Sequence, residues 1–461
     1  MQVGVDIHMC RLSQSGLFTY LWNLLHELSR LEHPHELKLF LYGHPDLEEP
    51  EQVRRLVSSL PRAEVRYVWD AEPPRLLSGA RSGAGAGSPT LGRRIDRGLL
   101  LPLWRKMLYP GSRPSYYLSR AAGLLRKPEG FGGVDVFHHP AGLVFPLNAK
   151  ANVMTLSDLI PRHFPYYCQG SDEWFEESFE RAREMDVILT YSEHTKRDVV
   201  ETLGVEAERI HVAPLAAHEQ YRPDLDPERL REVLGRHGLG GRPYVIYAGL
   251  VGARKNLARL VEAFHILRQE APSLGHRLVL AGGAFQMSEP IFEAIRALRM
   301  EGDVKWLGFV PFEDLPYLLG GAELFAFPSL YEGFGLPPLE AMACGTPVVC
   351  SSASSLPEVV GDAGLLFDPY RVNEMAESMH RVLADGGLRA ELGRKGLERA
   401  RLFSWEKTAR LTLAAYEEAF ARAGGGGAPP PSRRRAGPGR TKNYPHAQWW
   451  VVERLARQIK G

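Results

Sequence analysis

The chain has 461 residues, of which 44% are hydrophobic and 24% are charged, and this length predicts two or three domains with buried cores. Its 56 Lys and Arg against 55 Asp and Glu give a formal charge of +1, so no overall basic field attracts nucleic acid. The four cysteines form no C-x-x-C pair and have no His partners at metal-ligand spacing, so we expect buried thiols in a reducing compartment and no metal.

The first residues predict a β-strand, a loop and a helix. Residues 3–7 are mostly apolar, a loop with Gly16 follows, and the apolar side chains of residues 17–28 fall on one helical face. This start lacks a basic stretch followed by a long apolar run, so it does not read as a signal peptide. No apolar stretch reaches the roughly 18 residues that would span a bilayer. We therefore expect a cytoplasmic protein.

Two series of short apolar segments alternate with helical or turn-rich segments along the chain. The first comprises residues 3–7, 37–42, 134–137, 151–156 and 186–190, and the second comprises residues 244–249, 277–280, 304–307, 324–327, 347–350 and 365–367. Strands that alternate with helices indicate a parallel sheet covered on both faces. The sequence thus predicts an α/β protein with two doubly wound parallel-sheet domains.

The boundary between the domains should lie near residues 221–242, where prolines and a glycine cluster interrupt the pattern. We expect a first domain over 1–222, a second domain over 223–400, a closing helix over 401–423, and a disordered linker and tail over 424–461. Asp224 and Asp226 have the spacing of a D-x-D metal site, but the surrounding prolines favour a turn, so we expect no metal there.

An insertion over residues 78–130 interrupts the first domain. A Gly/Ala/Ser run leads into residues 93–127, where nine Arg and Lys face one acidic residue and interleave with Leu, Trp and Tyr. Such a basic amphipathic segment can lie peripherally on an anionic membrane surface. It can equally be a helical insertion that packs on its own domain with a solvated charged face. The sequence leaves both interpretations open.

The strongest local pattern is a strand, a loop with Glu332, Gly333 and Gly335, and a helix that begins near Pro337. The backbone N–H groups of the first helical turn make an anion site, and small glycines let a diphosphate approach the backbone closely. Glu332 on the loop and Glu340 about one turn into the helix can both accept hydrogen bonds from sugar and ribose hydroxyls. The alternative for Glu340 is a purely electrostatic role at the helix N-terminus.

A second strand, Gly-rich loop and helix surrounds Arg254, Lys255 and Asn256. Adjacent cations at such a turn suit a diphosphate leaving group, because Arg binds it as a bidentate fork and Lys as a point charge. Taken alone, the pair fits a solvated helix start equally well.

Four motifs together resemble the retaining glycosyltransferases of family 4. They are the E-x7-E of Glu332 and Glu340, the R-K-N of residues 254–256, the run over residues 354–363 and the Ser-Gly-Leu of residues 15–17. The resemblance covers about residues 1–420 without the insertion. It implies the GT-B fold, in which two Rossmann-like domains face a cleft, the second binding mainly the nucleotide-sugar donor and the first the acceptor. Binding at the carboxyl ends of the strands is general for doubly wound sheets.

For catalysis, the resemblance implies roles for three side chains. Arg254 and Lys255 would lie on the donor diphosphate, and Glu332 would meet the transferred sugar near its reacting end. Retention in this family is ascribed to front-face attack, in which the leaving phosphate oxygen helps to deprotonate the acceptor hydroxyl. Orientation and electrostatic stabilisation of the departing diphosphate then carry catalysis. Because protein cations take this part, no metal and no other cofactor is implied.

For donor binding, the resemblance adds four positions to the two cations. The amides around Gly335 and Leu336 would contact the phosphates, and Glu340 would bind the ribose hydroxyls. Gly16 would let a loop of the first domain close over the phosphates.

One motif departs from the family. Residues 155–161 are similar to a family segment that commonly carries His before Asp, where the His contacts the donor sugar, yet Ser157 precedes Asp158 here. The departure bears on the identity of the sugar. His138 and His139, which follow a predicted strand, are candidates for supplying an imidazole from a neighbouring loop, with a structural or exposed pair as the alternative.

The sequence therefore predicts a retaining, metal-independent glycosyltransferase that uses a nucleotide-diphosphate sugar and acts on a glycan, lipid-linked or polyol hydroxyl. The R-K-N-L motif of residues 254–257 is similar to that of mannosyltransferases that use GDP-mannose. A UDP-sugar is the other donor class. The alternative is a non-catalytic nucleotide-sugar-binding or scaffold protein of the same fold, against which the intact Glu332, Glu340 and paired cations argue. A two-domain solute-binding protein is disfavoured, because we see no signal peptide.

Overall fold

The computed structural model describes residues 1–7, 16–41, 51–60, 63–67, 134–141, 149–165, 172–285 and 287–424. Several predicted features lie outside the described residues. They are Ser15, the whole of the 78–130 insertion with its basic segment 93–127, and the tail after Gly424. Membrane contact through residues 93–127 therefore stays a prediction.

Seven parallel strands form the sheet of the first domain, in the order β3-β2-β1-β4-β5-β6-β7. The strands are β1 (Gln2–Asp6), β2 (Glu36–Leu41), β3 (Glu64–Tyr67), β4 (Val136–His139), β5 (Ala151–Thr155), β6 (Val187–Thr190) and β7 (Ile210–Val212). The helices of this part are α1 (Gly16–Arg30), α2 (Glu51–Ser58), α6 (Ile160–His163), α7 (Asp172–Ala182) and α8 (Glu193–Leu203). The apolar face of α1 is buried on this sheet, as its 3.6-residue periodicity predicts.

Six parallel strands form the second sheet, in the order β10-β9-β8-β11-β12-β13. They are β8 (Tyr244–Ala248), β9 (Arg277–Ala281), β10 (Val304–Gly308), β11 (Leu324–Phe327), β12 (Val348–Ser351) and β13 (Gly364–Phe367). The helices are α9 (Pro227–Arg236), α10 (Leu257–Glu270), α11 (Glu289–Ala297), α12 (Leu315–Gly320), α13 (Leu336–Ala343), α14 (Leu356–Val360), α15 (Val372–Ala384) and α16 (Gly386–Ala400). The central strands β8 and β11 are wholly buried, which explains their unbroken apolar runs.

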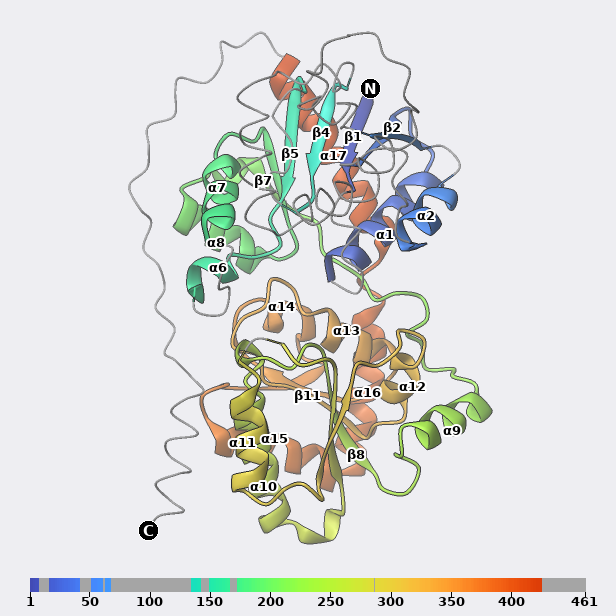
Figure 1. The fold of residues 1–461 in the computed structure, drawn as a ribbon, viewed down its shortest axis with the longest axis vertical. Coiled ribbons are helices and arrows are strands. Elements are labelled where there is room, and N and C mark those ends of the chain that lie inside the picture. The colour runs from blue at the N-terminus through green and yellow to red at the C-terminus, as the bar shows by residue number, and fades with distance from the viewer. Residues whose placement is uncertain are drawn as a thin grey trace, which may run out of the picture.

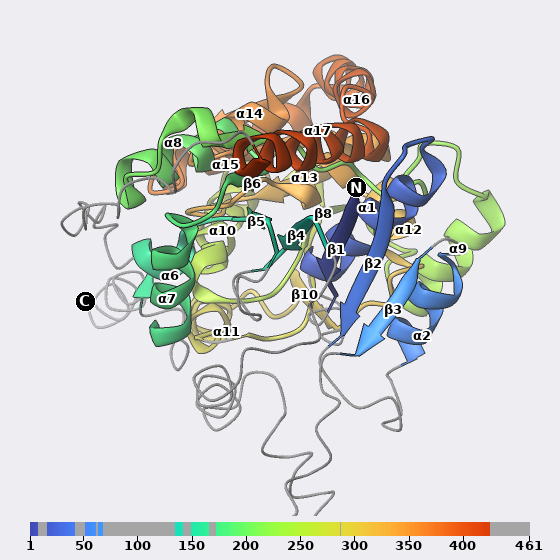
Figure 2. The same cartoon turned by 90° about the horizontal axis from the view of Figure 1, so that it is seen from above.

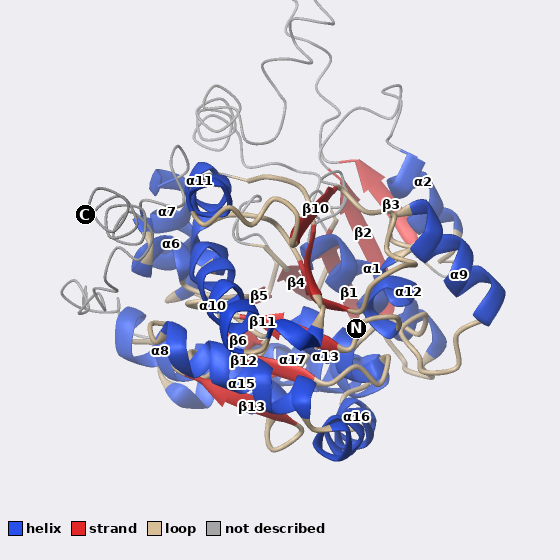
Figure 3. Ribbon diagram, turned by 90° about the horizontal axis from the view of Figure 1, so that it is seen from below, coloured by secondary structure: helices blue, strands red, loops and turns tan. Residues whose placement is uncertain are grey.

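The two sheets belong to two domains that lie one above the other in Figure 1, and helices flank the red strands in Figure 3. This confirms the predicted GT-B architecture of two Rossmann-like domains. The strands β3 and β7, at the two edges of the first sheet, were not predicted. Each is short, and β3 alternates charged with uncharged residues, so neither has an apolar run that stands out in the sequence.

The helix α17 (Trp405–Gly424) returns from the second domain to the first, where it packs against α1, β5 and β6. Figure 2 shows it across the strands of the first sheet. Its Tyr416 is fully buried, and the hydroxyl lies 2.8 Å from Nδ1 of His138 on β4. The hydroxyl of Thr408 donates to the carbonyl of Pro214 at the start of the interdomain connection. The predicted closing helix therefore joins the two domains.

The interdomain connection contains α9, whose first turn is capped by the side chain of Asp226. The Asp226 carboxylate accepts a 3.0 Å hydrogen bond from the backbone N–H of Glu228.

Cys344 and Cys350 are buried and unpaired. Among the described residues, no helix combines the length and the apolar character that a bilayer crossing requires.

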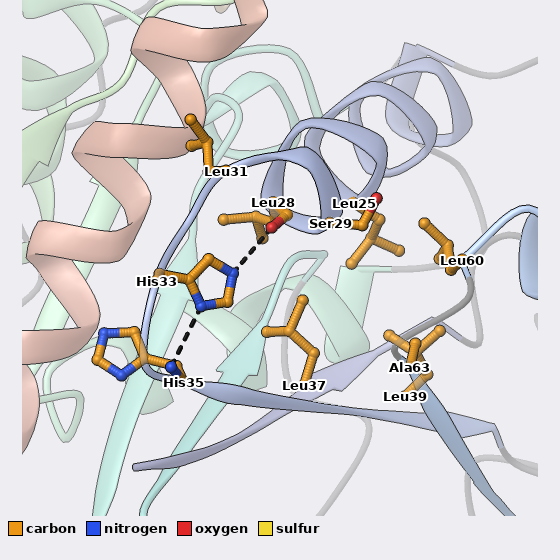
Figure 4. Close-up of a pocket in the computed structure, with 10 residues that line it drawn as sticks. All are labelled: Leu25, Leu28, Ser29, Leu31, His33, His35, Leu37, Leu39, Leu60 and Ala63. Atoms are coloured by element: carbon orange, nitrogen blue, oxygen red, sulfur yellow. Dashed lines mark hydrogen bonds between the residues drawn. The ribbon is translucent and has the colours of Figure 1, made fainter.

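A pocket lies between α1, β2 and the segment that precedes β3. Its lining residues are Leu25, Leu28, Ser29, Leu31, His33, His35, Leu37, Leu39, Leu60 and Ala63 (Figure 4). His33 Nδ1 accepts from the backbone N–H of His35 and Nε2 lies 2.8 Å from the carbonyl of Leu28, so both ring nitrogens are used within the protein. None of the predicted site residues lines this pocket.

Candidate active site

Two loops meet at the carboxyl ends of the neighbouring strands β8 and β11. The chain leaves β8 through a glycine loop into a short 3-10 helix, η6 (Ala253–Lys255), and then into α10. It leaves β11 through residues 328–335 into α13. Because β8 and β11 pair in parallel, their two loops lie side by side, and the backbone N–H of Leu330 donates to the carbonyl of Arg254. The two strongest sequence motifs therefore form one site.

The carboxylate of Glu332 is the centre of this site. Its Oε1 accepts hydrogen bonds from Arg254 at 2.9 Å, from Lys255 Nζ at 2.6 Å and from the Ser329 hydroxyl at 2.5 Å. The three charged side chains are between 12% and 19% exposed, so they form a mostly buried cluster and not a solvated helix start. One carboxylate is hydrogen-bonded to two cations, and the charge of Asp158 acts on the same two cations. Two adjacent cations suit an anionic ligand.

Burial and mutual attraction set the charge states in this cluster. Burial opposes ionisation of Glu332, but the charges of Arg254 and Lys255 outweigh it and lower the pKa of Glu332 to about 2. Burial also lowers the pKa of Lys255 to about 8, with the charge of Glu332 opposing that shift. Near neutral pH, Glu332 is thus ionised and Lys255 is mostly protonated.

Asn256 holds the two cations in place. It has a left-handed backbone conformation with φ of 60°, which ends η6 and begins α10. Its buried amide group donates to the carbonyls of Pro328 and Pro369, at 3.1 and 2.7 Å, and accepts from Arg259 at 3.0 Å. The third residue of the R-K-N motif therefore anchors the turn that aims Arg254 and Lys255.

We expect Asn256→Asp to destabilise the protein by about 2–4 kcal/mol. A carboxylate cannot donate to the carbonyls of Pro328 and Pro369, so two buried acceptors lose their partner. The thermal midpoint of unfolding measures the effect. Asp226→Asn serves as the matched control, because an exposed cap oxygen remains there. An Asn256→Asp midpoint equal to that of the control would contradict this role.

The residue that caps the N-terminus of α13 is Gly335, so no capping side chain binds the backbone N–H groups of the first helical turn. Gly335 has a φ of 125°, a conformation that favours glycine. The hydroxyl of Ser355 donates to the carbonyls of Glu332 and Phe334, which fixes the loop before the helix. Leu336 is the first residue of α13. The predicted phosphate-binding amides thus lie directly after Glu332 and its two cations.

Glu340 lies one turn into α13, as predicted, and its environment differs from that of Glu332. Burial raises the pKa of Glu340 to about 7, and a hydrogen bond with the Tyr221 side chain opposes the rise. The ring of Tyr221 contacts Phe312, with centroids 6.2 Å apart, and Phe312 is 44% exposed. Sequence analysis missed Tyr221, Phe312 and Ser329. The first two come from segments without a distinctive motif, whereas Ser329 lies in the same loop, three residues before Glu332.

The first domain contributes Ser157 and Asp158, which follow β5. Ser157 is exposed, and its hydroxyl donates to the Asp158 carboxylate at 3.1 Å. Burial raises the pKa of Asp158, and the positive charge of Arg254 counteracts that rise. A Cβ atom placed on Gly333 would lie 2.0 Å from the carbonyl oxygen of Ser157 and 3.0 Å from Asp158 Cβ. The Ser157–Asp158 segment therefore lies directly against the Glu332 loop.

His138 and His139 do not lie on a loop, so the structure agrees with the alternative of a structural pair and not with a loop imidazole. They are the last two residues of β4, and both are 0% exposed. His138 is hydrogen-bonded to Tyr416 and to the Thr155 hydroxyl, and burial lowers the pKa of both histidines to about 3. Their role is packing within the first domain, because neither ring reaches the surface.

Gly16 is the first residue of α1 and is exposed. A Cβ atom there would meet nothing within 4 Å in the described part of the chain, so the protein itself places no steric demand for glycine at this position.

Among the described residues, no three His, Cys, Asp or Glu side chains gather as a metal site would require.

Comparison with known proteins identifies relatives of this arrangement. The family model described as glycosyl transferases group 1 matches residues 232–399. The chain is 35% identical to the O-antigen chain mannosyltransferase B of Escherichia coli over 285 residues, which are 61% of this chain and 74% of that protein. It is 33% identical to the MMP alpha-(1->4)-mannosyltransferase of Mycolicibacterium hassiacum over 246 residues, or 52% of this chain and 56% of that protein.

Solved structures agree in fold. Anabaena Alr3699/HepE in complex with UDP and glucose matches with a TM-score of 0.60 at 17% identity, over 90% of this chain and 99% of that chain. At this identity the likeness bears on the fold alone. The family relationship rests on the sequence identity to the O-antigen chain mannosyltransferase B.

Proposed function

Because the chain belongs to the group 1 glycosyltransferases, we propose that it transfers mannose from GDP-mannose, with retention of configuration, to a hydroxyl of a glycan, lipid-linked or polyol acceptor. The relatives that support mannose are the two mannosyltransferases, one of which is named for an O-antigen chain. A UDP-sugar is the second donor class. The proposal places the donor on the second domain and the acceptor against the first.

The observation that carries this proposal is the Glu332 cluster beside the N-terminus of α13. Arg254 and Lys255 converge on one carboxylate, and the loop that holds this carboxylate leads directly into uncapped backbone N–H groups. A diphosphate fits such a site, because two cations and a helix N-terminus both attract negative charge. Glu340, one turn further on, would accept hydrogen bonds from the ribose hydroxyls.

The same residues can perform the transfer without a metal. As the bond between the sugar and the diphosphate breaks, negative charge grows on the leaving oxygen, and Arg254 and Lys255 stabilise it. The leaving oxygen takes the proton of the acceptor hydroxyl, which attacks from the same face. Glu332 keeps both cations oriented, and in this proposal the reacting end of the sugar lies beside it. The protein thus contributes pre-organised charge and orientation and no covalent intermediate.

We expect the donor kcat/KM to show a bell-shaped pH profile with limbs near pH 7 and pH 8. The pKa of Glu340 is about 7, so donor binding strengthens as this carboxylate ionises and accepts charge-assisted hydrogen bonds from ribose. The pKa of Lys255 is about 8, so phosphate binding weakens as it loses its proton. Initial-rate kinetics from pH 5.5 to 9.5 measure the profile. Glu340→Gln should lose the acid limb alone, and an unchanged acid limb would contradict the assignment.

Donor identity and stereochemistry are tested together. Purified protein is incubated with GDP-mannose, GDP-glucose, UDP-glucose or UDP-N-acetylglucosamine and a crude lipid and glycan extract, and the product is isolated for proton NMR. We expect GDP-mannose to give the highest rate and the new linkage to be α, as in the donor. A β linkage would overturn retention, and a faster UDP-sugar would overturn the donor.

A further inference from the structure

The residue directly before Glu332 enters the first domain. Tyr331 is 0% exposed, and its hydroxyl donates a 2.5 Å hydrogen bond to the carboxylate of Asp198 on α8. Its ring lies against His163, Phe164 and His194, with centroid distances of 5.4, 5.9 and 5.5 Å. One residue of the catalytic loop is thus buried among side chains of the other domain.

The acceptor for Tyr331 is itself fixed. Asp198 is 1% exposed and accepts hydrogen bonds from His163 Nε2 at 2.6 Å and from the Thr202 hydroxyl at 3.2 Å. His163 ends α6 and is also buried. Asp198 is therefore a rigid acceptor, since elements on both sides hold its carboxylate.

Tyr331 connects this acceptor to the catalytic cluster through its own backbone. Its side chain is held by Asp198 in the first domain, while its carbonyl accepts a hydrogen bond from the guanidinium of Arg254 in the second. The next residue, Glu332, binds the same guanidinium through its carboxylate. A displacement of Tyr331 would therefore move both partners of the Arg254–Glu332 ion pair.

Two further hydrogen bonds hold the same loop against the start of α8, and two more join the start of α8 to α14. The hydroxyls of Ser192 and Thr195 both donate to the carbonyl of Gly333, at 2.8 and 3.2 Å. The carboxylate of Glu358 on α14 accepts from the backbone N–H groups of Glu193 and His194, at 2.8 and 2.6 Å. The N-terminal half of α8 thus contacts the residues on each side of Glu332.

We propose that Asp198 and His163 are positioning residues for sugar transfer, which act through Tyr331 to fix the carboxylate of Glu332 when the two domains are in contact. The inference rests on the proposed function. In this proposal the first domain has two roles. It binds the acceptor, and it helps to orient the carboxylate of Glu332 on the second domain. Tyr331 makes the connection, because its side chain binds Asp198 in the first domain and its carbonyl binds Arg254 in the second.

The test compares two tyrosine variants that lose the same group. Tyr331→Phe removes the hydroxyl that Asp198 binds, and Tyr416→Phe removes an equally buried hydroxyl that binds His138, away from the Glu332 cluster. We expect Tyr331→Phe to lower the maximal rate of nucleotide release at least tenfold while the donor KM stays within twofold. Tyr416→Phe should stay within twofold in both. Equal rates in the two variants would overturn the proposal.

Substitution at Asp198 adds a graded readout. Asp198→Asn keeps an oxygen that can accept from the Tyr331 hydroxyl, whereas Asp198→Ala removes it. The maximal rate should therefore fall in the order wild type, Asp198→Asn, Asp198→Ala. An Asp198→Asn rate as low as that of Asp198→Ala, or an Asp198→Ala rate equal to wild type, would contradict the proposal.

Hydrogen–deuterium exchange separates this proposal from the proposed function. The backbone N–H groups of residues 331–335 should exchange faster in Tyr331→Phe than in wild type, and at the wild-type rate in Tyr416→Phe. If wild type turns over no donor, the proposed function fails, but the exchange comparison still decides whether Tyr331 orders the loop. Unchanged exchange in Tyr331→Phe would overturn the inference whatever the activity.

Discussion

Replacing Glu332 with Gln should lower the rate of nucleotide release by roughly 100- to 1,000-fold, which corresponds to about 3–4 kcal/mol of transition-state stabilisation. The carboxylate holds Lys255 Nζ at 2.6 Å and Arg254 at 2.9 Å, so it sets the direction of both cations. A neutral amide of the same shape offers one weaker acceptor, and its NH2 group repels the cations. Initial-rate measurements at saturating donor give the fold-change.

The same substitution should destabilise the protein by about 3–5 kcal/mol, because it leaves two mostly buried cations without their counter-charge. The pKa of Glu332 is about 2 in the folded protein against 4.5 ordinarily, so its stabilisation is complete above about pH 4.5 and is lost as the pH falls toward 2. Glu332→Gln should lack this part of the acid dependence. Inorganic pyrophosphate should restore stability by replacing the missing anion.

A matched control for Glu332→Gln is Glu391→Gln, which removes the carboxylate of an exposed Lys395 pair on α16. Surface pairs of this kind contribute little, so both rate and stability should stay near those of wild type. A Glu332→Gln rate within threefold of the control would contradict a catalytic role for the cluster.

Gly333→Ala should also abolish most of the activity, by about 100-fold, while leaving each domain folded. The added Cβ would lie 2.0 Å from the carbonyl oxygen of Ser157 and 2.9 Å from its carbonyl carbon, and the segment over residues 157–158 belongs to the other domain. These are backbone atoms that cannot rotate away, so the domains or the loop must separate. Nucleotide binding to the second domain should change little, which calorimetric titration with GDP can measure.

Gly235→Ala is the matched control for this second substitution. Gly235 lies in α9, and a Cβ there meets nothing within 4 Å in the described chain. Alanine in the last turn of α9 should raise stability by at most about 0.5–1 kcal/mol without affecting the rate. A Gly333→Ala variant as active as Gly235→Ala would show that close contact between Gly333 and Ser157 is not required.

The fold could be predicted from the sequence because buried parallel strands carry unbroken apolar runs. The predicted and observed bounds coincide for β11, and those of the other central strands differ by one or two residues. The edge strands β3 and β7 escaped prediction, because each is short and has no apolar run that stands out in the sequence. The family resemblance implied that Arg254 and Glu332 contact the same donor, but their direct ion pair could not be read from the spacing of the two motifs.

The least predictable part of the site is the contribution of long-range partners. Asp198 and His163 are polar residues without a motif, and only the packed structure brings them to Tyr331. The histidines on β4 show the converse, because two adjacent imidazoles looked functional while the core of the first domain encloses them. Residue type identifies chemistry, whereas burial decides whether that chemistry reaches a ligand.

The central claim is that Arg254 and Lys255 receive the diphosphate of a nucleotide sugar and that the protein transfers its sugar. The most direct test measures free GDP and UDP released from a panel of nucleotide sugars, with and without a crude lipid and glycan extract, by wild type and by Lys255→Ala. The account predicts acceptor-dependent release from one donor by wild type and at least a 100-fold lower rate in Lys255→Ala. Binding of GDP or UDP without release from any donor, or equal release by the two proteins, would contradict it.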